Sequence, residues 1–172
     1  MKTVATILIC CASVSSGFSG KPSGEWLAEW LGLEARNEAR ICQKLSTVVD
    51  QLDVSNLAYY IDLDGSNWGS YAKNCKPEVD AIHRMYKRTE GAFRIIATVP
   101  DRNVGGWYRF WCAAETSIQG CLVPINKALR EGCKEDCLLL DADVAYHGYE
   151  GDIHRSPDFW KDVAEKLIGK LK

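Results

Sequence analysis

Apolar and polar positions divide the chain into two alternating kinds of segment. Four short segments are apolar along most of their length rather than at every second position, which is typical of parallel strands covered on both faces. Between them, apolar residues recur every three or four positions, the spacing of an amphipathic helix. The expected strands are 3–11, 57–63, 93–99 and 138–142, with a further short one at 34–38. The expected helices are 24–32, ending at Gly32, and 43–53, 76–89, 125–132 and 156–171.

This alternation of strands and helices predicts the fold class. It favours an α/β fold with three layers, α/β/α, built on a flavodoxin-like doubly wound parallel sheet of about five strands. A chain of 172 residues has room for one core. We therefore expect a single domain over residues 1–172.

The first apolar segment, residues 3–11, also fits a second interpretation. Lys2 precedes it and small residues follow at 12–16, so residues 1 to about 20 have the composition of a secretory signal peptide. The two interpretations exclude each other, because removal of the segment would take a strand out of the sheet. We expect the strand, and with it a cytoplasmic protein; a secreted one is expected if residues 1 to about 20 are a signal peptide.

Charge and cysteine content narrow the classes of partner. The net charge of −2 and the sequence pI near 5.9 give no reason to expect nucleic acid or an anionic membrane. Beyond the first segment, no apolar run approaches the roughly 18 residues that a membrane span needs. The eight cysteines leave two interpretations open, disulfides and small buried hydrophobes. No CxxC pair or nucleotide-binding motif is present, so neither a metal nor an organic cofactor is implied.

The loops after the strands hold the candidate functional residues. In a parallel α/β sheet, ligands bind outside the carboxyl ends of the strands. The loops there supply a serine, histidines, acids and an amide, the groups that a nucleophile, a base, an orienting group and a hydrogen-bond donor require. These residues are Ser13, Asn67, Asp101, Asn103, His147, Asp152 and His154.

Three of these loops together resemble the motif blocks of the SGNH (GDSL-type) hydrolases. Cys11-Ala12-Ser13 stands where that family has Gly-Asp-Ser after the first strand. Gly65-Ser66-Asn67-Trp68 is similar to the block Gly-x-Asn-Asp, and Gly151-Asp152-Ile153-His154 is similar to Asp-x-x-His before a final helix. The blocks occur in the family's order along the whole chain.

The resemblance implies a carboxylic ester hydrolase that works through an acyl-enzyme. Ser13 would be the nucleophile and His154 the base, with Asp152 orienting the imidazole. Asn67 and backbone N–H groups, one of Ser13 and one near Cys42, would form the oxyanion hole.

The sequence departs from the family pattern at each block. Cys42, or alternatively Arg40, stands where the family has the glycine of its second block. The acid Asp152 lies two residues before His154 rather than three, so Glu150 is an alternative acid.

Aromatic residues on the same loops are expected to wall a substrate pocket, since such pockets are mainly apolar. They are Trp68, Trp107 and Trp111. We expect a small-molecule ester as substrate, with an acylated carbohydrate or lipid as the narrower hypothesis.

Two alternatives to an enzyme stay open. One is a catalytically inactive binding protein of SGNH type, which the altered blocks would explain. The other is a secreted, disulfide-containing binding protein from which residues 1 to about 20 have been removed.

Overall fold

The computed structural model describes residues 6–9, 25, 28–29, 32–40, 42–63, 65–101 and 114–141. Five parallel strands form one sheet in the order β2-β1-β3-β4-β5. The strands are β1 (Thr6–Ile9), β2 (Glu34–Asn37), β3 (Leu57–Asp62), β4 (Phe93–Ala97) and β5 (Cys137–Leu140). The helices are α2 (Leu45–Val48), α3 (Lys76–Arg88) and α5 (Leu122–Gly132), with 3-10 turns η1 (Val49–Gln51) and η2 (Trp68–Tyr71). All five expected strands are confirmed, and their order is that of a flavodoxin-like sheet.

The first strand lies inside the sheet. Thr6 of β1 pairs with Glu34 of β2 on one side, and Ile9 pairs with Ile61 of β3 on the other. Removal of residues 1–20 would therefore separate β2 from the rest of the sheet. The chain builds outward from β1 first to β2 and then to β3, so the strand order reverses between β1 and β3, the place where ligands bind in this class of fold.

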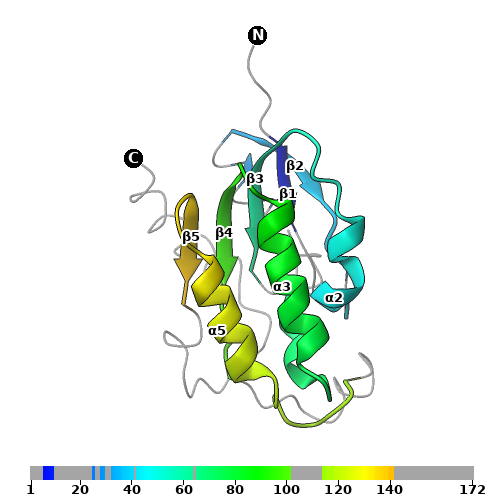
Figure 1. Ribbon diagram of the computed structural model, residues 1–172. Helices are drawn as coiled ribbons and strands as arrows, with labels where there is room; N and C mark the ends of the chain where they lie inside the picture. Colours follow the sequence, from blue (N-terminus) through cyan, green and yellow to red (C-terminus); the bar gives the residue numbers. More distant parts are fainter. Residues whose placement is uncertain are drawn as a thin grey trace.

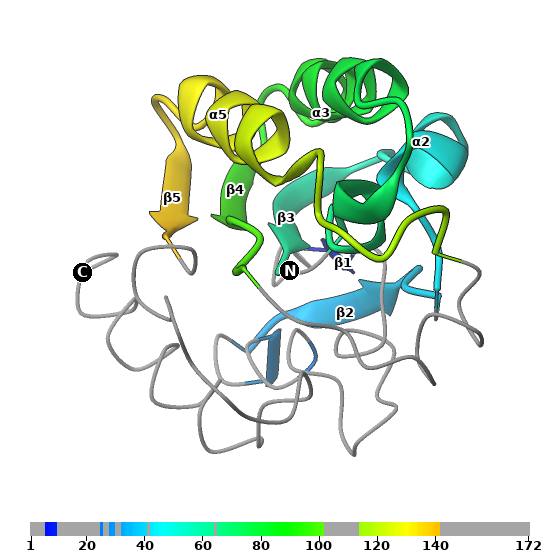
Figure 2. The ribbon, with the colours of Figure 1, turned by 90° about the horizontal axis from the view of Figure 1, so that it is seen from below.

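Helices α2, α3 and α5 cover one face of the sheet, as Figures 1 and 2 show from two directions. Consecutive strand residues divide between the two faces: Tyr60 and Ile96 join the cluster beneath these helices, whereas Ile61 and Ile95 join a second cluster that includes Ala28. Because both faces are packed, each strand needs a continuous apolar run. This explains the pattern from which the fold was predicted, and the expected three-layer architecture is confirmed.

The ends of the helices follow local chemistry. Gly32 has a φ of 67° and ends the first helix, with Leu33 N donating to Ala28 O at 2.9 Å. Helix α5 begins at Leu122 rather than at 125, because Pro124 fits within a first turn where no N–H partner is needed. The expected helix 43–53 is shorter than predicted: α2 ends at Val48 and continues only as η1. The expected helix 156–171 lies outside the described residues.

Most of the described cysteines form disulfides and are not free, buried thiols. Cys75 is bonded to Cys121, and Cys133 to Cys137, each pair with Cα atoms 5.2 Å apart. Cys42 is disulfide-bonded as well. Cys75 and Cys121 immediately precede α3 and α5, so their bond joins the starts of two helices that pack side by side.

We expect the Cys75–Cys121 bond to contribute more stability than the second one. It closes a loop with a sequence separation of 46, against 4 for Cys133–Cys137, and the longer loop restricts the unfolded chain more. Chain entropy predicts a loss of about 4 kcal/mol in the free energy of unfolding for Cys75→Ala/Cys121→Ala and about 2 kcal/mol for Cys133→Ala/Cys137→Ala. Urea denaturation of both double variants measures this. Equal losses would contradict the expectation.

Among the described residues, no helix is long and apolar enough to cross a membrane.

Candidate active site

The segments after β2 and β3 contain the two predicted oxyanion residues that the structure describes, Cys42 and Asn67. Both follow carboxyl ends of strands at the same edge of the parallel sheet. Arg40, Trp68 and the exposed Asp101 are described as well. The remaining predicted site residues lie outside the described residues, so their roles stay predictions. They are Ser13, Asn103, Trp107, Trp111, His147, Glu150, Asp152 and His154.

Asp62, the last residue of β3, shapes the turn that leads to Asn67. Its buried carboxylate accepts hydrogen bonds from Gly65 N at 2.6 Å and from the Tyr60 hydroxyl at 3.2 Å. A Cβ atom on residue 65 would lie 2.5 Å from both carboxylate oxygens. The glycine of the Gly-Ser-Asn block is therefore required by this close approach. Asp62 is not among the site residues predicted from the sequence, although an acid that ends an apolar strand three residues before a glycine is a usable signal.

Asn67 lies at the start of η2, where its backbone is hydrogen-bonded and its side chain bonds to none of the described residues. Its carbonyl oxygen accepts from the Ser70 hydroxyl at 2.6 Å and from Ser70 N at 3.3 Å. The residue is only 8% exposed. Its side chain does not cap η2, and its amide makes no hydrogen bond to any of the described residues. An oxyanion hole requires a buried N–H donor, and the side-chain NH₂ of Asn67 donates to none of the described residues.

Trp68 occupies the position where the family's block has its last aspartate. Its indole is 3% exposed, and its ring centroid lies 5.9 Å from that of Tyr71. The indole Nε1 is buried and has no hydrogen-bond partner among the described residues. Trp68 therefore packs in the interior, and nothing in the described part of the chain supports the pocket wall predicted for it.

The turn at Cys42 has a left-handed backbone, with a φ of 60°. A side chain in this region costs about 1–2 kcal/mol, which glycine avoids. The resemblance places the family's glycine at Cys42 or, alternatively, at Arg40. Cys42 has a conformation that glycine adopts without strain, although the residue type differs.

A salt bridge links this turn to a distant part of the chain. Lys44, two residues after Cys42, contacts the carboxylate of Glu115, whose other oxygen accepts from Lys73 N at 3.2 Å. The hydrogen bond from Lys44 and then that from Lys73 lower the pKa of Glu115 below its usual value. The ion pair joins the segment before α2 to the segment after residue 113.

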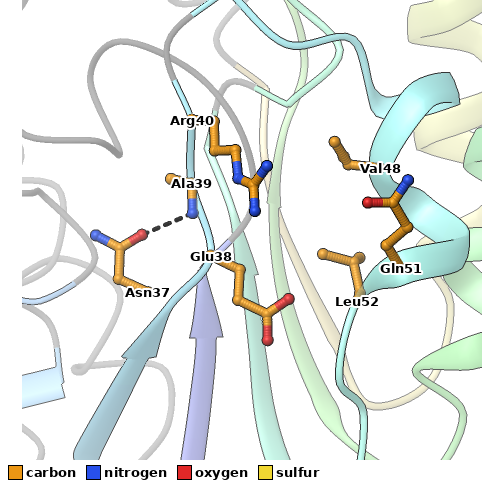
Figure 3. A pocket seen from close by; sticks show the side chains of 7 residues that line it. All are labelled: Asn37, Glu38, Ala39, Arg40, Val48, Gln51 and Leu52. Atoms are coloured by element: carbon orange, nitrogen blue, oxygen red, sulfur yellow. Dashed lines mark hydrogen bonds between the residues drawn. The ribbon is translucent and has the colours of Figure 1, made fainter.

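A pocket of about 260 Å³ lies between the end of β2 and the α2–η1 segment (Figure 3). Glu38 and Arg40 extend into it from one side, opposite the buried side chains of Val48 and Leu52. Glu38 is paired with Arg36 at 3.4 Å, whereas Arg40 makes no ion pair with another of the described residues. The pocket combines an apolar wall with a cation and lies two residues from the Cys42 turn.

The described residues hold no group of three or more histidine, cysteine, aspartate or glutamate side chains that could bind a metal ion.

Comparison with known proteins identifies the fold through structure alone. No model of a protein family matches the sequence, and no curated protein matches it. Solved structures do match over nearly the whole chain. A protein described as lipolytic and of the G-D-S-L family, from Desulfitobacterium hafniense DCB-2, has a TM-score of 0.68 at 14% identity, covering 95% of this chain and 97% of that one.

Two further matches agree with the first. A lipase/acylhydrolase from Enterococcus faecalis has a TM-score of 0.69 at 10% identity, over 98% of this chain and 95% of that one. Est24, a carbohydrate acetylesterase from Sinorhizobium meliloti, has a TM-score of 0.62 at 14% identity, over 96% and 99%. The chain therefore has the fold of the SGNH (GDSL-type) hydrolases, as its sequence predicts.

Proposed function

We propose that the protein is a carboxylic ester hydrolase that acts through a Ser-His-acid site and an acyl-enzyme intermediate. The observation that carries the proposal is the amide of Asn67, which follows β3 in the block Gly65-Ser66-Asn67, is largely buried and bonds to no other described side chain or backbone group. The left-handed turn at Cys42 supports it, since glycine, the residue expected in the second block, adopts such a backbone without strain. The shared fold of known esterases supports it further.

The proposed mechanism assigns one step to each group. The Ser13 hydroxyl attacks the ester carbonyl carbon while His154 takes its proton, and Asp152 or Glu150 orients the imidazole. The tetrahedral oxyanion is stabilised by the Asn67 amide and by backbone N–H groups of Ser13 and Cys42. Collapse expels the alcohol, which receives the proton from His154. Water then attacks the acyl-enzyme by the same route and releases the acid.

The proposed substrate is a small-molecule ester. The pocket of about 260 Å³ beside the Cys42 turn is large enough for a short acyl or alcohol group. An acylated carbohydrate is the narrower proposal, because Est24, with the same fold, is a carbohydrate acetylesterase; a lipid ester is the other. No nucleic acid is proposed as a partner, given the net charge of −2.

For the location of the protein, we propose an oxidising compartment in place of the expected cytoplasm. The bonded cysteines Cys75, Cys121, Cys133 and Cys137 favour it, because thiols are kept reduced in most cytosols. A thiol titration of the protein taken from its own cells tests this proposal, and four reactive thiols at these positions would contradict it.

The experiment that tests the function is fluorophosphonate labelling of the folded protein, followed by peptide mapping. A fluorophosphonate reacts only with an activated serine, so we expect a single adduct on Ser13 that disappears in His154→Ala. Ser15→Ala is the matched control and should label normally. Absence of an adduct on the folded protein would favour the alternative, a catalytically inactive binding protein of the same fold.

A further inference from the structure

A buried carboxylate that the proposed mechanism does not use lies beneath the site segments. Glu78 is the third residue of α3 and is 3% exposed. One of its carboxylate oxygens accepts a short hydrogen bond from the Ser46 hydroxyl, and the other accepts from Ser46 N at 3.4 Å. Burial of a carboxylate is costly unless it is hydrogen-bonded, so the position of Glu78 depends on the bonds from Ser46.

The same carboxylate is packed against the backbone of η2. A Cβ atom on Gly69 would lie 2.6 Å from a Glu78 carboxylate oxygen and 2.9 Å from its carboxyl carbon. Gly69 therefore has to be a glycine as long as Glu78 occupies this place. Ser46 and Gly69 hold the carboxylate from two sides, one through hydrogen bonds and the other through direct packing.

These two contacts lead to the two oxyanion segments. Ser46 lies in the first turn of α2, four residues after Cys42, and Gly69 lies two residues after Asn67. Figures 1 and 2 show α2 beside α3 on the same face of the sheet. The Glu78 carboxylate thus lies between the segment that carries the Cys42 turn and the segment that carries the Asn67 amide.

We infer that Glu78 is a positioning residue, which sets the distance between the Cys42 N–H and the Asn67 amide in the oxyanion hole. The inference rests on the proposed ester hydrolysis. Two donors that converge on one oxygen must keep their spacing within a fraction of an ångström, and a displacement of about 1 Å can cost on the order of 100-fold in rate. A carboxylate with both oxygens hydrogen-bonded is a stiffer spacer than an apolar contact.

The test compares Glu78→Gln and Glu78→Ala with a control of similar burial. We expect kcat for p-nitrophenyl acetate to fall about tenfold in Glu78→Gln and about 100-fold in Glu78→Ala, with KM changed less than about twofold. A boronic acid inhibitor bonds to the nucleophilic serine and forms a tetrahedral boronate whose negatively charged oxygen occupies the oxyanion hole. Its affinity should weaken in parallel with kcat. The control is Tyr86→Phe, which removes a buried hydrogen bond of 2.7 Å to Leu129 O; it should lower Tm and leave kcat unchanged.

A second variant protects the test against misfolding. Should Glu78→Gln fail to fold, Ser46→Ala removes only the hydroxyl bond to Glu78 and should lower kcat in the same direction with KM unchanged. If the wild-type protein hydrolyses no ester and takes no fluorophosphonate, the proposed function fails and the positioning role falls with it. If the wild type is active and the folded Glu78 and Ser46 variants keep full kcat and inhibitor affinity, Glu78 is structural only and the inference is overturned.

Discussion

Replacing Ser13 by alanine is expected to lower kcat for an activated ester by about 10⁴-fold or more. The loss is this large because, in the proposed mechanism, the acyl group is bonded to the Ser13 hydroxyl oxygen, so the acyl-enzyme cannot form without it. The role of Ser13 rests on its place in the block Cys11-Ala12-Ser13 after β1 and on the order of the motif blocks. Steady-state kinetics with p-nitrophenyl acetate measures it, with circular dichroism to confirm folding.

A double variant distinguishes a catalytic triad from a serine that acts without His154. Residues that act as one unit are not additive, so Ser13→Ala/His154→Ala should be no slower than Ser13→Ala alone. His147→Ala, in the same loop as His154, is the control and should retain most activity. A Ser13→Ala protein with wild-type kcat would refute the assignment of the nucleophile.

The fold could be predicted from the sequence because both faces of the sheet are buried. Strands such as β3 and β4 must then be apolar at consecutive positions, and Tyr60-Ile61 and Ile95-Ile96 show this directly. The edge strand β2, Glu34–Asn37, has no buried residue and a weak pattern, and it was expected mainly from its place in the alternation.

The lengths of the helices were harder to predict. Helix α2 ends at Val48, where φ is −121°, within the β-branched run of Thr47, Val48 and Val49. Such residues have low helix propensity, but the apolar spacing over 43–53 concealed this. The pairing of the cysteines was not readable either, because connectivity depends on which elements the fold brings together.

In the described part of the candidate site, only residues that belong to a short sequence motif could be predicted. Asn67 could be found from Gly65-Ser66-Asn67 after a strand, since the turn is built from neighbours in sequence. The positive φ of Cys42 could not, because cysteine gives no signal of a left-handed backbone. Glu78 was missed because it looks like an ordinary residue of a helix first turn, and its partners Ser46 and Gly69 come from other elements.

Replacing Asn67 by alanine is expected to lower kcat by about 10²–10³-fold, the effect of removing one side-chain donor from an oxyanion hole. KM should change little, because the donor acts on charge that develops in the transition state. Asn67→Asp should be slower still, since a carboxylate in that place repels the oxyanion. Asn74→Ala is the matched control: its side chain accepts only a local bond from Lys76 N at 3.1 Å among the described residues, so kcat should be unaffected.

The structure also indicates that Asn67→Ala should affect kcat without a large change in the free energy of unfolding. The Asn67 side chain does not cap η2, and it donates no hydrogen bond within the described part of the chain. The turn is instead held by backbone groups and by Asp62, which the substitution leaves in place. We therefore expect the free energy of unfolding to change by less than about 1 kcal/mol. A large loss of stability with kcat intact would mean that the amide supports the fold, and the oxyanion hole would have to be sought elsewhere.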